Sequence, residues 1–229
     1  MFGKLKSMFT KTVFLPHPGV VFPEPSVKGR ELPAEGYRGQ MKLGIIIGHD
    51  RVEPGAKMAA PYGIYEYFFN TDLATRMAAY AAKRCPNMTV EIFARNGVGI
   101  AGAYENARQG LCDAVVELHF DAYNTKAKGT TTLCTADAND VEFAHILHGM
   151  MCKLFNRIGS EDRGVQCIAK SARGGVNVHS FPGGVNCLVE PFYGDNPDEA
   201  KKVMKDPDAL AGCLIDGVVL WAKKVDLLK

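Results

Sequence analysis

Two apolar segments that each lead into a histidine constrain the fold of this chain more than any other feature. The first covers residues 42–47 and is followed by Gly48 and His49, and the second covers residues 114–119 and ends in His119. Runs of roughly four to eight apolar residues between polar ends are typical of buried strands. Because open α/β sheets carry their sites at the carboxyl ends of strands, both histidines are expected at one edge of one sheet.

The chain from residue 42 onward alternates between strand and helix patterns. Further strands are predicted over residues 89–94, 130–134, 165–169 and 187–190. Helices are predicted over residues 64–84, 100–111, 140–158 and 207–225. This alternation predicts an α/β fold with a single twisted, mostly parallel sheet of about six strands flanked by helices.

The first 40 residues have a different composition from the rest. Prolines and glycines recur between Pro16 and Gly39, which excludes a long helix or a central strand there. We predict an extended N-terminal arm over residues 1–40, in which residues 2–15 have the spacing of a short amphipathic helix. A single domain over residues 41–229 is predicted to follow it.

Charge and hydropathy exclude several classes of protein. The chain has 27 Lys and Arg against 25 Asp and Glu, and no basic block indicates a nucleic-acid partner. No apolar run reaches the roughly eighteen residues of a membrane span, and the N-terminus lacks the pattern of a signal peptide. We therefore expect synthesis in the cytoplasm. The seven cysteines are scattered without a Cys-x-x-Cys pair, which indicates free, buried thiols.

Two histidines and two acids are candidates for a metal centre. His49 and His119 supply imidazoles, Glu66 lies in the first turn of a predicted helix, and Glu190 ends the last apolar strand. Hydrolytic zinc sites typically use three ligands from His, Glu and Asp and leave one position for water, whose proton a nearby carboxylate takes. An acid such as Glu66 is also favoured at a helix start by the helix dipole. Since the four residues come from separate segments, their spacing does not show that they meet.

Several other polar residues have both a functional and a structural interpretation. Arg95 and Arg163 could bind a substrate carboxylate or form ordinary ion pairs. His179 lies in a glycine-rich loop and could contact substrate at the rim of a site. His145 and His148 lie three apart on a predicted helix, and we expect them at the surface.

Five segments, in order along the chain, resemble the zinc-dependent N-acetylmuramoyl-L-alanine amidases of the amidase-3 type. The segments are Gly48-His49 with Gly55-Ala56, Glu66-Tyr-Phe-Phe-Asn70, Asp113 with His119-Phe-Asp-Ala122, Asp162-Arg-Gly-Val165, and Leu188-Val-Glu190 with the residues up to Asn196. The resemblance covers about residues 42–225. The chain departs from the family pattern at Asp50 and Arg51, where glycines are usual, at Glu117, where serine is usual, and at Pro191, where glycine is common.

The resemblance implies that His49, Glu66 and His119 bind Zn²⁺ and that Glu190 is the catalytic carboxylate. It implies hydrolysis of the amide bond between N-acetylmuramic acid and L-alanine in peptidoglycan, by a catalytic domain over residues 41–229. Without an export signal, a phage-type endolysin that reaches the cell wall or periplasm after release is expected. The alternatives are a related zinc carboxypeptidase or deacylase acting on another amide, and an inactive wall-binding module.

Overall fold

A six-stranded sheet forms the centre of the structure, a computed structural model that describes residues 39–228. The strands are β1 (Met41–Ile47), β2 (Met88–Phe93), β3 (Ala114–Leu118), β4 (Thr130–Cys134), β5 (Asp162–Cys167) and β6 (Val185–Glu190). Their order is β2-β1-β3-β6-β4-β5, and all neighbours are parallel except β4 and β6. The predicted mostly parallel sheet is therefore confirmed. The predicted arm over residues 1–40 lies outside the described residues apart from its last two.

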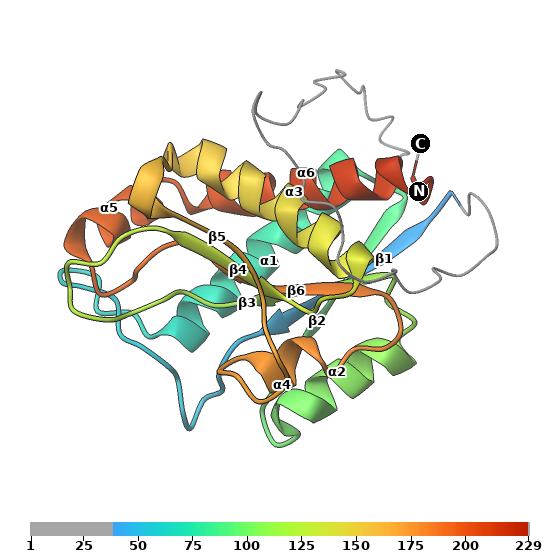
Figure 1. The fold of residues 1–229 in the computed structure, drawn as a ribbon, viewed down its shortest axis with the longest axis horizontal. Helices are drawn as coiled ribbons and strands as arrows, with labels where there is room; N and C mark the ends of the chain where they lie inside the picture. Colours follow the sequence, from blue (N-terminus) through green and yellow to red (C-terminus); the bar gives the residue numbers. More distant parts are fainter. Residues whose placement is uncertain (1–38, 229) are drawn as a thin grey trace, which may run out of the picture.

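Helices cover both faces of this sheet (Figure 1). The helices are α1 (Glu66–Arg84), α2 (Gly99–Gln109), α3 (Ala138–Phe155), α4 (Gly175–Val178), α5 (Pro197–Lys205) and α6 (Pro207–Lys224), with a 3-10 turn at Gly159–Glu161. Helices α1, α3 and α6 pack together on one face, and α2 and α4 lie on the other. The structure thus has the three layers of an open α/β fold. No helix among residues 39–228 is both long and apolar enough to cross a membrane.

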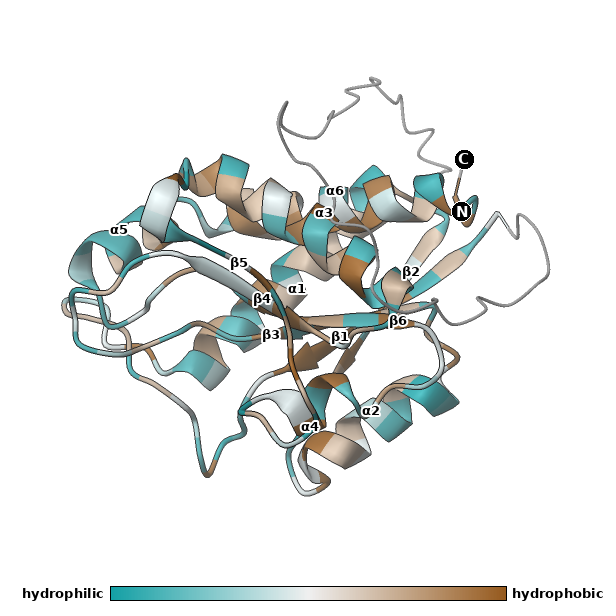
Figure 2. Ribbon diagram, viewed as in Figure 1, coloured by the Kyte–Doolittle hydropathy of each residue, from teal (hydrophilic) through white to brown (hydrophobic). Residues whose placement is uncertain are grey.

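The alternation of side chains along β1 explains how one strand contributes to two cores. Leu43, Ile45 and Ile47 belong to the large apolar cluster under α1, α3 and α6. Ile46 points to the opposite face and joins a smaller cluster that includes Tyr104 of α2. Successive side chains of a strand alternate between faces, so a strand buried on both sides is apolar throughout. Figure 2 shows this as apolar colouring along the central strands.

The predicted strands and long helices are all present, with ends that differ from the prediction by three residues or fewer. Two helices were not predicted. Helix α5 starts at Pro197 after Asn196, whose side chain accepts hydrogen bonds from two backbone N–H groups of the first turn. This capping is a helix-start signal that the apolar spacing does not reveal. Helix α4 is a single turn, too short for periodicity to indicate.

His148 lies in the interior, so the expectation of a surface position was wrong. Its side chain points from α3 toward the sheet, and the residue is 5% exposed. Nε2 lies 2.8 Å from Asp162 Oδ1, and Nδ1 lies 3.1 Å from Thr132 Oγ1. His145 is half-buried on the same helix. The prediction failed because the apolar face of α3 is wide enough to include a histidine that finds polar partners on β4 and β5.

All seven cysteines are free thiols, as predicted, but only three of them are buried: Cys112, Cys134 and Cys187. Three more are half-buried, and Cys167 is exposed, so the expectation of burial was wrong for this thiol. It ends the edge strand β5.

Candidate metal centre and active site

The carboxyl ends of β1, β3 and β6 meet at one edge of the sheet and carry the candidate residues. Ile47 of β1 pairs with Leu118 of β3, and Leu118 pairs with Val189 of β6. The chain beyond these three positions supplies His49, His119 and Glu190. Glu66 reaches the same place from the first turn of α1. Parallel strand pairing therefore brings together residues that are up to 141 positions apart in the chain.

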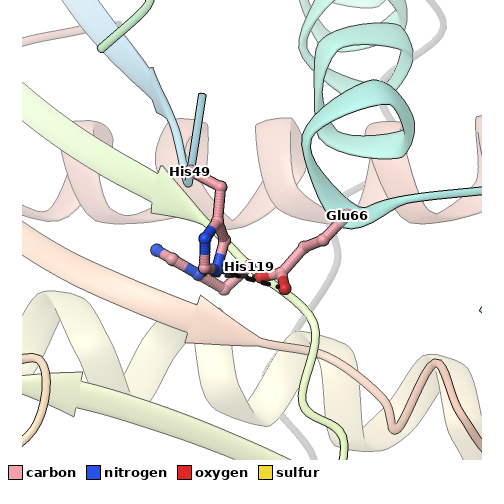
Figure 3. Close-up of side chains that lie close together, drawn as sticks. All are labelled: His49, Glu66 and His119. Carbon is pink, nitrogen blue, oxygen red and sulfur yellow. Dashed lines mark hydrogen bonds and ion pairs between the residues drawn. The ribbon is translucent and has the colours of Figure 1, made fainter. Parts of the chain in front are cut away.

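The side chains of His49, Glu66 and His119 point toward one another (Figure 3). Glu66 lies between the two imidazoles, with Oε2 3.2 Å from His49 Nε2 and Oε1 2.8 Å from His119 Nδ1. The ring centroids of the two histidines are 5.1 Å apart. One ligand atom from each residue lies within 4.8 Å of the other two. The grouping that the sequence analysis required is present.

Two glycines allow the backbone to approach these side chains. A Cβ atom on Gly48 would lie 2.3 Å from Leu118 O and 2.5 Å from His119 Nε2. A Cβ atom on Gly55 would lie 2.6 Å from the His49 ring and 2.7 Å from Glu66 Oε2, and Gly55 also has φ +79°. Real Cβ atoms do not occupy such positions, so both sites require glycine. His49 itself has φ 65°, a strained conformation that is concentrated at functional sites.

Electrostatics holds the two central groups in complementary charge states. Burial raises the pKa of Glu66, but the hydrogen bonds and charges of His119 and His49 outweigh this effect and bring the pKa down to about 2. Burial lowers the pKa of His119, but hydrogen bonds with Glu117 and Glu66 raise it well above its usual value. In the metal-free protein Glu66 is therefore held as an anion and His119 as a cation, and His119 would release a proton on binding a metal ion.

Glu190 lies beside this group and is in a different electrostatic environment. Burial raises the pKa of Glu190 to about 8, and the nearby carboxylates of Glu66 and Asp121 add to the increase while His119 opposes it. Its Oε2 atom is buried and has no hydrogen-bond partner among residues 39–228. A buried polar atom without a partner is rare in folded proteins and indicates a missing ligand, water molecule or ion.

The donor atoms fit a divalent metal ion. Two imidazole nitrogens and one carboxylate form the set found in hydrolytic zinc centres, which leave a coordination position open. Nitrogen and oxygen donors of this kind suit first-row divalent ions generally. The unpartnered oxygen of Glu190 lies next to this set.

Comparison with known proteins decides the family. The family model of N-acetylmuramoyl-L-alanine amidases (Amidase_3) matches residues 43–219, which is most of the chain. The chain belongs to this amidase family. It is a hydrolase that acts on peptidoglycan, at the amide bond that gives the family its name. The match also covers every element from β1 into α6.

Solved structures of amidases share the fold of this amidase. The catalytic domain of CwlV from Bacillus (Paenibacillus) polymyxa var. colistinus has a TM-score of 0.65 at 18% identity, over 80% of this chain and 99% of that one. An N-acetylmuramoyl-L-alanine amidase from Clostridium difficile 630 has a TM-score of 0.67 at 19% identity, over 81% and 98%. The catalytic domain of the CD27L endolysin, which targets Clostridia difficile, has a TM-score of 0.61 at 22% identity, over 79% and 98%. A search of curated proteins found no match.

The amidase places the three residues predicted to bind substrate in different surroundings. Arg95 follows β2 at the edge of the sheet that carries the site, and its charge acts on Asp50 in the loop after β1. Arg163 is the second residue of β5, and its guanidinium lies 4.7 Å from the ring of Tyr193. His179 lies toward the edge of the sheet opposite the candidate metal centre. Its Nε2 atom is 2.9 Å from the carbonyl oxygen of the residue that follows β5. The substrate contacts of Arg95, Arg163 and His179 remain predictions.

Glu117 was not predicted to have a role, although it departs from the family pattern, where serine is usual. Glu117 is fully buried and lies 2.9 Å from His119 Nε2. The signal that could have found it is the spacing, because residues two apart on a strand share a face. Its other partners, Tyr104 and Asn177, come from α2 and α4 and have no such signal.

A second group of potential ligands lies between α3 and β5 in the described part of the amidase. His148 Nε2 is 3.3 Å from Cys152 Sγ and 2.8 Å from Asp162 Oδ1. Ordinary hydrogen bonds account for these contacts, because a neutral imidazole can donate from Nε2 to Asp162 while Thr132 contacts Nδ1. We assign this cluster a structural role in packing α3 on the sheet.

Proposed function

We propose that this amidase is zinc-dependent and that His49, Glu66 and His119 hold the metal ion. The single observation that carries the proposal is the position of the Glu66 carboxylate, 3.2 Å from one imidazole and 2.8 Å from the other. The donor set and its charge match hydrolytic zinc sites. When bound, zinc supplies a positive charge that polarises the scissile carbonyl group and makes a water molecule more acidic.

We propose that Glu190 transfers protons during the reaction. Burial raises the pKa of its carboxyl group to about 8 in the metal-free protein, and the ionised form is the general base. It would accept a proton from the attacking water molecule and donate it to the departing L-alanine nitrogen. The unpartnered Oε2 atom of Glu190 is available for both contacts. A carboxyl group in this role typically contributes roughly 10²–10⁴-fold to the rate.

We further propose that the chain acts as an endolysin-type enzyme, with residues 41–229 as the catalytic domain and residues 1–40 as an arm outside it. The similarity to the catalytic domain of an endolysin supports this proposal. The family match begins at residue 43, which supports the boundary. Arg95 and Arg163 are proposed to contact the acidic groups of the substrate, since both are cations on segments near the site.

The test combines lysis with product analysis. The purified protein should reduce the turbidity of permeabilised Gram-negative cells, lose this activity with a chelator and regain it with zinc. Mass spectrometry should find intact stem peptides released from the glycan, since a carboxypeptidase would instead shorten them. Elemental analysis should find about one zinc per chain, and His49→Ala and His119→Ala should each lose it.

Glu190→Gln tests the proton-transfer role. The variant should keep its zinc and its fold but lose activity by roughly 10²–10⁴-fold. Glu53→Gln is the matched control, because Glu53 is an exposed carboxylate in the loop after β1 and should not affect the rate. Undiminished lysis by Glu190→Gln would refute the mechanism.

A further inference from the structure

Glu117 is a buried carboxylate directly behind the His119 imidazole. It is the fourth residue of β3, its side chain is fully buried, and Oε1 lies 2.9 Å from His119 Nε2. The other ring nitrogen, Nδ1, faces Glu66 at 2.8 Å. The His119 ring therefore lies between two carboxylates, of which only Glu66 faces the proposed metal position.

Two further donors converge on Glu117. The Tyr104 hydroxyl donates to Oε2 at 2.9 Å, and the Asn177 side-chain amide donates to Oε1 at 2.7 Å. Tyr104 comes from α2 and Asn177 comes from α4. The two helices on the face of the sheet opposite α1, α3 and α6 therefore hold the carboxylate in place. An ionised carboxylate accepts hydrogen bonds and donates none. With donors already at both oxygens, Glu117 is held as an acceptor for a hydrogen on Nε2.

The backbone prevents the His119 ring from taking another position. A Cβ atom on Gly48 would lie 2.5 Å from Nε2 and 2.6 Å from Cε1, so the chain at Gly48 packs tightly against this edge of the ring. On the other side, the His119 backbone N–H donates to Val189 O at 3.1 Å. Gly48 thus limits the ring on one edge, the bond to Val189 fixes the His119 backbone, and the ring has its Nδ1 atom toward Glu66.

From these contacts we propose that Glu117 is a positioning residue for the metal centre. It keeps the hydrogen of His119 on Nε2, so that the Nδ1 lone pair is the one presented to the metal ion. It also adds a negative charge behind the ligand, which strengthens the attraction between His119 and a cation. Partners of this kind orient metal-binding histidines and typically change metal affinity by about 10–100-fold. The inference rests on the proposed zinc centre.

A purely structural role makes a different prediction. If Glu117 served only as a hydrogen-bond partner for Tyr104 and Asn177, its replacement would lower the stability of the metal-free protein and leave zinc affinity unchanged. If it positions His119, the dissociation constant for zinc changes in the folded protein. Metal affinity therefore separates the two roles, whereas catalytic activity alone does not.

The experiment measures zinc dissociation constants by competition with a chelating dye. Glu117→Gln keeps the size of the side chain and removes its charge, and it should weaken zinc binding by about tenfold or more. Glu53→Gln, an exposed carboxylate near the same edge of the sheet, should bind zinc as the unmodified protein does. A change of less than about threefold in Glu117→Gln would overturn the proposal.

A second measurement needs no variant and applies even if Glu117→Gln does not fold. Long-range ¹⁵N–¹H spectra of the zinc-bound protein identify which nitrogen of His119 carries the hydrogen, with His119→Gln used for assignment. The proposal requires the hydrogen on Nε2, and a hydrogen on Nδ1 would overturn it. If the unmodified protein binds no zinc, the proposed zinc centre itself fails. If it binds zinc but either measurement gives the overturning result, only the role of Glu117 fails.

Discussion

The buried ion pair between Arg157 and Glu199 gives the sharpest prediction for stability. Arg157 Nη1 and Nη2 donate to the two carboxylate oxygens of Glu199 at 2.6 Å and 2.7 Å, and their side chains are 2% and 4% exposed. The same guanidinium donates from Nη2 to Pro191 O at 3.4 Å and from Nε to Thr130 Oγ1 at 3.1 Å. The pair therefore fixes the chain directly after the proposed catalytic residue Glu190.

The perturbation is Glu199→Gln, which removes one charge and keeps the shape of the side chain. The variant should lower the free energy of unfolding, because the Arg157 side chain is 2% exposed and loses its buried counter-charge. Removing one partner of a buried pair costs about 3–5 kcal/mol, and the amide oxygen keeps one hydrogen bond, so we expect about 3 kcal/mol. For a chain of this size, that lowers the melting temperature by about 6–12 °C.

Urea unfolding followed by circular dichroism measures this cost. Glu161→Gln is the control, since Glu161 contacts the same guanidinium at 3.4 Å but its side chain is 40% exposed, and the expected loss is below about 1 kcal/mol. The double variant Arg157→Met with Glu199→Leu should recover most of the loss, because it leaves no unpaired buried charge. Equal losses for Glu199→Gln and Glu161→Gln would refute the reasoning.

Three further predictions concern pH, backbone geometry and thiol chemistry. The Glu190 carboxyl group has a pKa of about 8 in the folded, metal-free protein and 4.5 in an unfolded chain. The free energy of unfolding should therefore fall as pH rises from 4.5 to about 8, because the folded state binds the proton more tightly. The urea midpoint of Glu190→Gln should fall less over the same pH range. Gly55→Ala should weaken zinc binding by about tenfold or more, because the added Cβ would lie 2.7 Å from Glu66 Oε2. Gly97→Ala is the control, since it introduces similar backbone strain at φ +76° but has no neighbour within 4 Å and should not change zinc affinity. Equal zinc dissociation constants for the two variants, measured by competition with a chelating dye, would contradict this prediction. Cys167 should be the one thiol that reacts rapidly with a thiol reagent in the folded protein, and rapid modification of a Cys167→Ser variant would contradict the prediction. Burial raises the pKa of the remaining cysteines, which are Cys85, Cys112, Cys134, Cys152, Cys187 and Cys213.

Local patterns in the sequence were enough to predict the strands and the long helices, and the family resemblance supplied the full set of candidate metal ligands. Apolar runs and helical spacing identify strands and long helices because burial selects side chains at the period of each element. His49 and His119 follow two such runs, and parallel strands end at the same edge, so their meeting could be expected. Glu66 and Glu190 joined them through the order of motifs along the chain.

Only the tertiary structure decided which polar side chains are buried and what they contact. Three features depend on contacts between segments that are distant in the chain: the antiparallel pairing of β4 with β6, the buried His148 and the pair Arg157–Glu199. Glu117 shows the limit most clearly, because its donor Asn177 lies 60 residues away on a single helical turn that no periodicity indicates. A sequence pattern records which residues avoid water, and that is a local property. The partner of a buried charge is fixed by packing between segments that are distant in the chain, and no local pattern specifies it.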